Sequence, residues 1–290
     1  KPTRFSLILC TLNRMDTLAE FMECLCYQDF TDFELILVDQ NKDDRLVPLI
    51  NRYGGMYRIK HIRSEKGLSK SRNVGLKYAN GEIIAFPDDD CIYPPSLLKE
   101  IDLRFKQGIY DVLSIKMTNS VPHGRKIQDK IPSQWVKRET VMLLMASISM
   151  FYRSHVVDAV GGFDERLGLG ANTIFRGGED YDYPLRAMGK GFSVYFDNSL
   201  EVYHPWDDAD IDREKDLGSK VYNGGAAEMF VLNKHRFGTW YKVKRVIRRL
   251  LIIAFYMCKL DLPKAGLSLR LLRGMLDYFN YRPPEKGCHV

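Results

Sequence analysis

Three adjacent aspartates, Asp88, Asp89 and Asp90, follow a short apolar run. Like charges this close repel one another, so three ionised carboxylates favour a nearby cation. In extended backbone, residues i and i+2 point the same way, so Asp88 and Asp90 can converge while Asp89 diverges. A hard divalent ion binds one or two carboxylates and keeps positions for water and phosphate oxygens. The triplet therefore predicts a divalent cation site, with a solvated acidic turn as the alternative.

A second acidic pair, Glu179 and Asp180, opens a predicted helix behind Gly177 and Gly178. Acids in the first turn of a helix are stabilised by the helix dipole, so N-terminal capping explains the pair without catalysis. The glycines favour a site, because they let a backbone approach a ligand closely. On these residues alone, the structural interpretation is slightly better than the catalytic one.

His204 follows a predicted strand and precedes Pro205. A neutral imidazole is a suitable manganese ligand, although a hydrogen-bonded structural histidine is the alternative. Arg72 and Asn73 lie inside a predicted helix. Either they belong to its solvated face, or the arginine faces a phosphate or the edge of a nucleotide base.

Alternating strands and helices must position these residues. Short continuous apolar runs predict strands buried on both faces, and residues at helical spacing predict the helices between them. The predicted strands cover residues 5–10, 33–39, 57–62 and 82–86. The predicted helices cover residues 16–27, the region around 46–50, and 69–79, the last with Val74 and Leu76 inside.

Such alternation indicates a mostly parallel sheet, in which ligands bind outside the carboxyl ends of the strands. Those ends carry the segment from Thr11 to Arg14, Asp39 and the aspartate triplet. Beyond Asp90 the alternation loosens, and residues 118–139 are polar and irregular. Further strands are predicted over residues 112–115, 143–151, 192–196 and around 202–206. Further helices are predicted over residues 95–105, around 156–160, over 178–188 and from 213 onward.

The order of these motifs resembles the family-2 glycosyltransferases of the GT-A fold. The resemblance covers residues 4–206 and is most specific between Ser71 and Asp90. It implies an α/β GT-A fold (Rossmann-like, with a mostly parallel central sheet) and an inverting transfer of a sugar from a nucleotide-diphosphate donor. It also implies Mn²⁺ or Mg²⁺, and an acceptor that is a glycan or lipid-linked glycan for capsule, O-antigen or exopolysaccharide.

The resemblance also implies roles for individual residues. Asp88 and Asp90 match the Asp-x-Asp positions, with Asp90 the direct metal ligand, and His204 matches a histidine that some members use at the metal. Asp180, second of the Glu179-Asp180 pair, matches the general base. The expected nucleotide or donor contacts are Thr11, Asn13, Arg14, Asp39, Arg72, Asp88 and Asp89.

Two positions depart from the family pattern and put the donor preference in doubt. Gln40-Asn41 replaces the usual Asp-Gly after the second strand, and Pro87 replaces a more usual Leu before the acids. The chemistry fits the expected roles: a metal neutralises charge on a diphosphate leaving group, and a base takes the acceptor proton. The alternatives are a catalytically silent sugar- or lipid-binding module on the same fold and a metal-dependent phosphohydrolase.

The net charge of +6 is unevenly distributed, because residues 234–290 carry 13 basic and 3 acidic side chains and leave −4 for the rest. Residues 241–259 combine apolar positions at helical spacing with lysines and arginines, a pattern typical of membrane-surface helices. We expect a peripheral contact with an anionic membrane through residues 241–273. Packing on the catalytic domain is an equal alternative. No recognition motif accompanies the basic helix, so nucleic acid is not expected.

The remaining sequence features concern compartment and domains. Six scattered cysteines without a CxxC pair favour reduced thiols. We find no secretory signal pattern, and the apolar run 250–258 is shorter than the about 20 residues of a membrane span. We therefore expect a cytoplasmic protein, peripheral on the inner face of the cytoplasmic membrane. Its expected domains are a glycosyltransferase domain over 1–210 and a basic amphipathic helical extension over 211–290.

Overall fold

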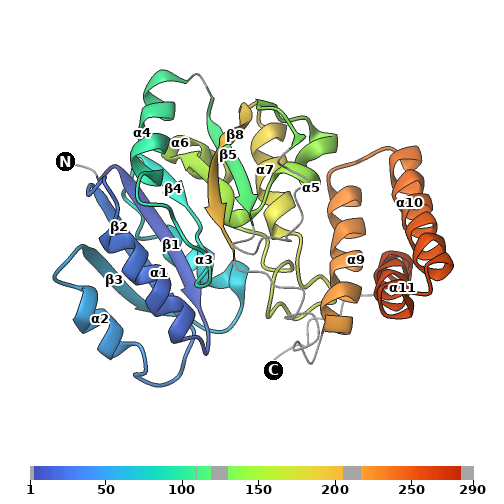
Figure 1. Cartoon of the computed structure of the whole chain (residues 1–290), viewed down its shortest axis with the longest axis horizontal. Coiled ribbons are helices and arrows are strands. Elements are labelled where there is room, and N and C mark those ends of the chain that lie inside the picture. The colour runs from blue at the N-terminus through green and yellow to red at the C-terminus, as the bar shows by residue number, and fades with distance from the viewer. Residues whose placement is uncertain (1–2, 109, 119–129, 205–216, 282–290) are drawn as a thin grey trace, which may run out of the picture. The chain divides into compact units, whose positions relative to one another are not determined.

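The structure, a computed structural model, describes residues 3–108, 110–118, 130–204 and 217–281 (Figure 1). The chain divides into two compact units, residues 1–164 with 180–211 and residues 165–179 with 212–290. The boundary predicted after residue 210 lies outside the described residues. Residues 165–179 belong to the second unit, which the sequence pattern did not indicate.

The first unit is built on an eight-stranded sheet in the order β3-β2-β1-β4-β7-β5-β8-β6. Its first part alternates as predicted. The elements are β1 (Phe5–Thr11), α1 (Asp16–Cys26), β2 (Phe33–Asp39), α2 (Val47–Tyr53), β3 (Arg58–Arg63), α3 (Leu68–Leu76) and β4 (Ile83–Ala85). Strand β1 is parallel to both β2 and β4, and β2 is parallel to β3. The carboxyl ends of β1, β2 and β4 therefore meet at one edge of the sheet.

The second part of the sheet is mixed. Strand β7 is antiparallel to β4 and β5, and β6 is antiparallel to β8, whereas β5 and β8 are parallel. The elements are α4 (Leu97–Gln107), β5 (Val112–Thr118), β6 (Gln134–Trp135), α5 (Val141–Leu144), β7 (Met150–Arg153), α6 (Ser154–Val160), α7 (Glu179–Gly189) and β8 (Val194–Tyr203). The mixed α/β architecture confirms the predicted fold class.

One predicted strand is wrong over most of its length. Residues 143–151 form the end of α5, a 3₁₀ turn η3 (Ser147–Ser149) and only the start of β7. The periodicity of a short apolar run does not distinguish a buried strand from a buried helical turn. The two extended pieces predicted near 192–196 and 202–206 are joined, because β8 runs continuously from Val194 to Tyr203.

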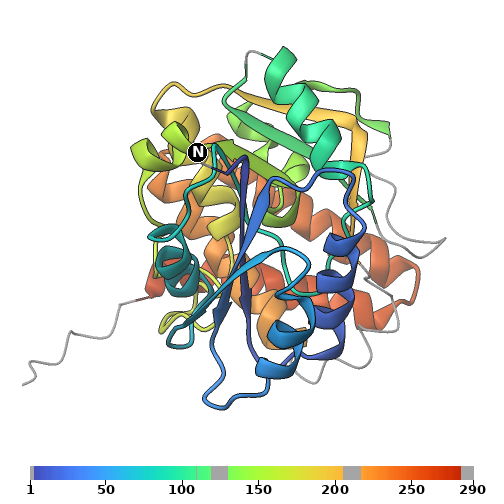
Figure 2. The ribbon, with the colours of Figure 1, turned by 90° about the vertical axis from the view of Figure 1, so that its left-hand side faces the viewer.

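Helices cover both faces of the sheet, with α1 and α2 on one side and α3 on the other (Figure 2). Alternate residues of β1, such as Leu7 and Leu9, enter a core with residues of α1 and α4. The residues between them face α3. A Cβ built on Gly75 would lie 2.4 Å from Ile8 Cγ2 and 3.1 Å from Val38 Cγ2. Helix α3 therefore lies too close to the strands for a side chain at position 75.

This close packing corrects the predicted face of α3. Val74 and Leu76 are only half-buried, and the buried positions are Ser69, Ser71, Arg72 and Gly75. The solvated-face interpretation of Arg72 is wrong, because its side chain is 2% exposed. Small residues face the strands because little space separates the helix from the sheet, which hides the usual apolar periodicity.

The second unit contains three long helices, α9 (Leu217–Lys234), α10 (Thr239–Cys258) and α11 (Leu262–Asp277). Glycines allow α9 and α11 to touch through their backbones. A Cβ on Gly225 would lie 2.1 Å from Leu271 O, and one on Gly274 would lie 2.0 Å from Tyr222 O. The leucines of α11 divide between its two sides, with Leu272 buried and Leu269 exposed.

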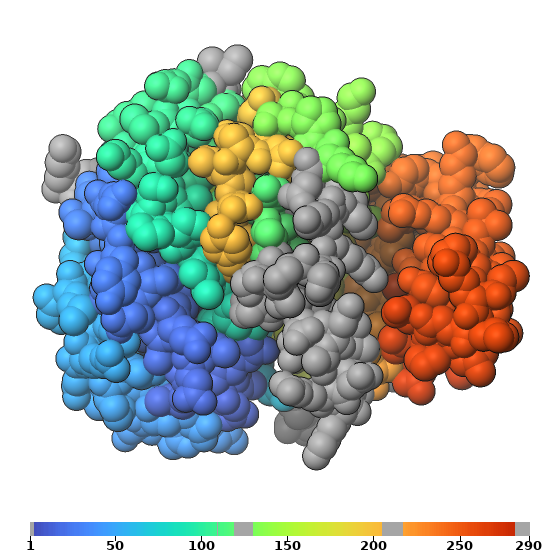
Figure 3. All heavy atoms as spheres, in the orientation of Figure 1, coloured from blue at the N-terminus to red at the C-terminus, as the bar shows by residue number. Residues whose placement is uncertain are grey.

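Helix α10 turns its apolar side outward. None of its residues is buried, and Ile247, Leu250, Leu251 and Phe255 are between 43% and 65% exposed. Arg245 is the better-covered side chain, 24% exposed, and its Nε lies 2.6 Å from Glu228 Oε1 of α9. In Figure 3 the atoms of α10 and α11, orange to red, stand at the surface. The expected amphipathic helix is present; Val246, Ile252 and Ile253 are half-buried, and the rest of its apolar stripe is exposed.

Two further expectations concern membrane spans and cysteines. Within the part of the chain that the structure describes, we find no helix with the length and hydropathy needed to cross a bilayer. The described cysteines, Cys10, Cys24, Cys26, Cys91 and Cys258, are all free. Cys288 lies outside the described residues.

Candidate active site

Asp88, Asp90 and His204 come together beyond the ends of β4 and β8. One ligand atom from each lies within 4.8 Å of the others, and His204 Nε2 is 3.2 Å from Asp90 Oδ1. An antiparallel bridge between Ile92 and Tyr203 joins the two segments. The backbone N–H of His204 also donates to Thr118 O at 3.0 Å. Residues more than a hundred positions apart are thereby held at one point.

These three side chains fit a divalent cation. Two carboxylates and one imidazole suit Mn²⁺, and the carboxylates also suit Mg²⁺. The side chain of Asp88 is 39% exposed, so a cation held here could keep coordination positions for water or for the oxygens of a diphosphate. The residues present therefore match the ion that the sequence motif predicts.

The charges around this cluster perturb its titration. Burial raises the pKa of Asp90, but the hydrogen bond and charge of His204 and the charge of Arg14 outweigh it and hold that pKa at about 2. Burial lowers the pKa of His204, yet its hydrogen bond to Asp90 leaves it raised above its usual value. Burial also raises the pKa of Asp88, while Arg72 lowers it. The cluster therefore concentrates negative charge, which the cationic side chains of Arg14 and Arg72 partly compensate.

Asp89 points away from the cluster and is held from β1. Thr11 Oγ1 donates to Asp89 Oδ2 at 2.6 Å, and both residues are at least 92% buried, with 1% and 8% of their surfaces exposed. Arg14 lies at the surface with its side chain 50% exposed, 3.4 Å from Asp89 Oδ1 and in direct contact with Asp90. Thr11 thus anchors the aspartate loop, whereas Arg14 is placed where an incoming anion could meet it.

Arg72 connects this cluster to Asp180. Its Nη2 lies 3.4 Å from Asp88 Oδ1 and its Nη1 lies 3.7 Å from Asp180 Oδ1. The guanidinium carbon stands 5.3 Å from the ring centre of Phe163 and 5.9 Å from that of Phe86. A buried arginine needs such paired charges and flat neighbours, since an uncompensated buried cation is costly. The guanidinium of Arg72 therefore lies between Asp180, the predicted base, and Asp88 of the predicted metal site.

Asp180 stands in the first turn of α7. Gly178 precedes the helix with φ +82°, in the left-handed region that glycine adopts without steric cost. The Asp180 side chain is 33% exposed and accepts a hydrogen bond from Ser147 of η3. Its neighbour Glu179 is 6% exposed. Of the two acids, Asp180 is the one that a substrate could reach.

Asp39 lies at the end of β2 with none of its surface exposed. Its Oδ1 accepts from the backbone N and from Nδ2 of Asn41, each at 2.8 Å. Its Oδ2 lies 2.9 Å from His61 Nε2 and 3.1 Å from Arg63 Nη1. The predicted nucleotide-contact residue is therefore surrounded by protein donors, and Arg63, 39% exposed, is the member of this group that faces outward.

The unusual Gln40-Asn41 pair has a structural role. Asn41 Oδ1 accepts from the backbone N of Asn13 at 2.8 Å, and Gln40 Oε1 accepts from the backbone N of Gly67 at 2.8 Å. Asn13 has φ 58°, a conformation that asparagine tolerates better than most residues. These side chains join the loops that follow β1 and β2 to the start of α3.

Sequence reasoning missed Ser147, His61 and Arg63. Ser147 falls inside the wrongly predicted strand, so nothing in the local pattern marked it. His61 and Arg63 are polar residues of an edge strand, where they look like ordinary solvent-facing positions. Their register opposite Leu37 and Asp39 in the β2–β3 pairing is the signal that identifies them, and it requires the sheet.

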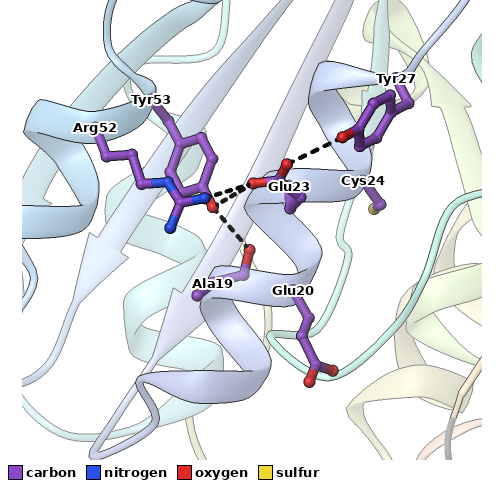
Figure 4. A pocket seen from close by; sticks show the side chains of 7 residues that line it. All are labelled: Ala19, Glu20, Glu23, Cys24, Tyr27, Arg52 and Tyr53. Atoms are coloured by element: carbon purple, nitrogen blue, oxygen red, sulfur yellow. Dashed lines mark hydrogen bonds and ion pairs between the residues drawn. The ribbon is translucent and has the colours of Figure 1, made fainter.

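A separate hollow of about 430 Å³ lies against α1 and α2. Figure 4 shows Arg52, Tyr53 and Tyr27 converging on Glu23. Glu23 accepts from Tyr53 at 2.7 Å and from Tyr27 and Arg52 at 3.2 Å. None of the seven lining residues is a predicted site residue, and the carboxylate is already paired. The hollow is distinct from the acidic site.

The arrangement agrees with comparisons to known proteins. The sequence pattern of "Glycosyl transferase family 2" matches residues 6–153, which include β1 to β4 and the aspartate triplet. The chain belongs to glycosyltransferase family 2. Its GT-A fold and the family predicted from the sequence motifs are both confirmed.

Individual relatives illustrate the match. The poly(ribitol-phosphate) β-N-acetylglucosaminyltransferase TarS of Staphylococcus aureus strain Mu50 is 34% identical over 119 residues, covering 39% of this chain and 21% of TarS. The structure of S. aureus TarS 1–349 in complex with UDP-GlcNAc has a TM-score of 0.60 at 19% identity, covering 96% of this chain and 93% of that one. The Pyrobaculum calidifontis mannosyltransferase PcManGT, in complex with GDP-Man and Mn²⁺, has a TM-score of 0.68 at 13% identity, covering 96% and 88%. The match thus spans about a fifth of full-length TarS.

Proposed function

We propose that this family-2 chain transfers a sugar from a nucleotide-diphosphate donor to a hydroxyl of a glycan or lipid-linked acceptor. One observation carries the proposal: the Asp180 carboxylate, one-third exposed, is separated from the cluster of Asp88, Asp90 and His204 by the guanidinium of Arg72 alone. A transferase with a diphosphate leaving group needs this combination of one base and one cation site. A phosphohydrolase would need a nucleophilic aspartate, and a silent module would need neither group.

Each side chain has a proposed part in the reaction. Asp88, Asp90 and His204 would hold Mn²⁺ or Mg²⁺, which neutralises charge on the leaving diphosphate when bound. Arg14, beside the acids and half-exposed, would bind a phosphate oxygen. Asp180 accepts the proton of the acceptor hydroxyl as that oxygen bonds to the anomeric carbon and the bond from this carbon to the diphosphate breaks. One base opposite the leaving group gives inversion of configuration.

The proposed nucleotide end of the donor lies near Asp39, Asn13 and Arg63. Asp39 has both oxygens engaged by protein donors, so it would act by orienting His61 and Arg63 as well as by accepting from a base or ribose. The similar structures are complexes with UDP-GlcNAc and with GDP-Man. Both donors therefore belong in a test, because they differ in base and in sugar.

The experiment measures nucleoside diphosphate released from UDP-GlcNAc, GDP-Man and other nucleotide sugars, with Mn²⁺, Mg²⁺ or a chelator. Slow release from one donor with a divalent ion, suppressed by the chelator, supports the proposal. Release of nothing from any donor would favour the silent module. Phosphate released from simple phosphomonoesters would favour the phosphohydrolase.

We also propose that residues 241–273 contact an anionic membrane, which would place the enzyme on the inner face of the cytoplasmic membrane in surface-polysaccharide synthesis. Ile247, Leu250 and Leu251 are exposed on α10, and Lys244 and Arg248 are exposed on the same helix. An apolar stripe beside basic residues suits insertion into an anionic interface, where each basic residue contributes about 1 kcal/mol.

Flotation with vesicles that contain phosphatidylglycerol tests this contact against neutral phosphatidylcholine vesicles. Binding to the anionic vesicles at low salt, lost in Ile247→Glu/Leu251→Glu, supports it. Equal recovery with both vesicle types would argue against a charge-dependent contact. Absence of binding would leave α10 as a surface for another partner.

A further inference from the structure

Asp180 is held on one side only. Ser147 Oγ donates to Oδ1 of Asp180, and Arg72 Nη1 lies 3.7 Å from the same oxygen. Among the described residues, no hydrogen bond or ion pair reaches Oδ2. The side chain is 33% exposed, and of its two oxygens only Oδ1 is held by described protein groups.

Ser147 makes this contact instead of a common local one. Serine hydroxyls in helical turns usually donate to a carbonyl three or four residues back. Ser149, in the same turn η3, does so, with its Oγ 3.0 Å from Ala146 O. Ser147 instead reaches across 33 residues of sequence to Asp180, although it is equally enclosed, at 4% exposed against 1% for Ser149.

The turn that carries Ser147 is itself anchored to the sheet. Ser114 of β5 donates from Oγ to Leu144 O at 2.9 Å, and Ser149 N donates to Ala146 O at 3.0 Å. Strand β7 begins directly after the turn and pairs with β4 and β5. Ser147 therefore presents its hydroxyl from a part of the chain that is fixed on both sides.

We propose that Ser147 is a positioning residue for the base, acting with Arg72 to hold Oδ1 so that Oδ2 accepts the proton of the acceptor hydroxyl. The proton moves from the acceptor oxygen to Oδ2, and the freed electron pair of that oxygen forms the bond to the anomeric carbon. The donor hydrogen bond to Oδ1 stays in place throughout. This inference rests on the proposed function.

The test compares Ser147→Ala with its matched control Ser149→Ala, using the nucleotide sugar that the wild-type protein turns over. Misplacing a catalytic group by about 1 Å can cost about 10²-fold, so we expect kcat to fall between about tenfold and 10²-fold in Ser147→Ala. The KM for the donor stays within about twofold, because Ser147 does not reach the cation cluster. Ser149→Ala keeps the wild-type kcat.

A double-mutant cycle separates positioning from folding. In the Asp180→Asn background, adding Ser147→Ala should lower kcat no further, since the group that it positions is already lost. If Ser147→Ala unfolds, Ser147→Cys keeps the size with a weaker donor, and a folded Cys variant with reduced kcat supports the inference.

Four outcomes decide the matter. Reduced kcat in Ser147→Ala alone, absent in the Asp180→Asn background, supports the role of Ser147. Equal kcat in Ser147→Ala and Ser149→Ala overturns it while the proposed function stands, and so does an additive loss in the double variant. A wild-type protein that releases no nucleotide from any donor overturns the proposed function, and this inference with it.

Discussion

Helices α3 and α10 both reverse the usual arrangement of an amphipathic helix. Helix α3 buries Arg72, Ser69 and Ser71 and leaves Val74 half-buried. In helix α10, Leu251 is 65% exposed, whereas the side chain of Arg245 is only 24% exposed. In α3 the reversal has a visible partner, the carboxylates of Asp88 and Asp180. In α10 the apolar side chains Ile247, Leu250 and Leu251 are left exposed.

The comparison shows that the polarity of a helix face depends on its surroundings, and that a buried face need not be apolar. A buried cation is retained where carboxylates compensate it. Contiguous exposed apolar surface is typical of sites that bind another molecule. One helix serves the site from within, and the other is expected to serve an interaction outside its own unit.

The largest expected effect tests the group that α3 faces. We expect Asp180→Asn to lower turnover by about 10² to 10⁴, the usual contribution of a general base, while donor affinity stays unchanged. Calorimetry with the active nucleotide sugar and a turnover assay measure both. Asp158→Asn, at an exposed position of α6, is the surface control. Near-normal turnover, or lost donor affinity, would show that Asp180 is not the base.

The second prediction concerns metal binding and pH. A histidine that binds a divalent ion must be neutral, and the pKa of His204 is raised, so lowering the pH through that pKa should protonate His204 and weaken the proposed metal site. We expect Mn²⁺ affinity to fall about tenfold for each pH unit below that pKa. Titration calorimetry at pH 8 and pH 6 measures this.

The matched variant for this prediction is His204→Gln, which removes the titrating group. It should bind Mn²⁺ more weakly at pH 8 and lose most of the pH dependence. An equal slope in both proteins would assign the proton to another residue.

The third prediction tests whether Arg72 stabilises the fold by compensating the charges of Asp88 and Asp180. Arg72→Met should lower the free energy of unfolding by about 2 kcal/mol, because Asp88 and Asp180 lose their shared cation. Lys70→Met, at a partly exposed position of the same helix, breaks an ion pair with the exposed Glu65 and should cost much less, because solvent screens such pairs. Denaturant unfolding compares them, and equal losses would contradict the distinction between the two positions.

The smallest expected effect tests the outward side of α10. Leu251→Glu should change the free energy of unfolding by no more than about 0.5 kcal/mol, as exposed positions do. Leu272→Glu on α11, where the leucine is 6% exposed, should cost about 3 kcal/mol by burying a carboxylate. If both variants lose the same stability, the apolar stripe of α10 is covered within the protein.

The sequence predicted the parts of the site that lie at strand ends. Residues 5–10, 33–39 and 82–86 are mostly apolar, so their strands and the acids at their ends could be placed. Asp88, Asp90 and His204 converge as the order of motifs suggested, although Asp89 and Asp90 lie in a turn and not in the extended backbone that the prediction assumed. These features are local in sequence or fixed by the topology of parallel strands.

What the sequence could not predict depends on contacts between distant residues. Ser147 bonds Asp180 only because β7 returns beside β4. Arg72 is buried only because α3 approaches the sheet closely, which no periodicity reveals. The exposed side of α10 was recognised as apolar, but the covering of Arg245 depends on Glu228 in another helix. The periodicity of a sequence predicts which residues share one face of a helix. Which residues pack against that face depends on the tertiary structure.

Gly75 affects the candidate active site by setting how closely α3 approaches the sheet. It lies one helical turn after Arg72, and a methyl group there would meet Ile8 Cγ2 at 2.4 Å. The missing side chain sets the thickness of the layer between helix and sheet, and with it how far the guanidinium extends toward Asp88 and Asp180. The residue at position 75 therefore determines whether Arg72 can reach Asp88 and Asp180. A larger side chain there would be tolerated only with smaller residues at positions 8 and 38.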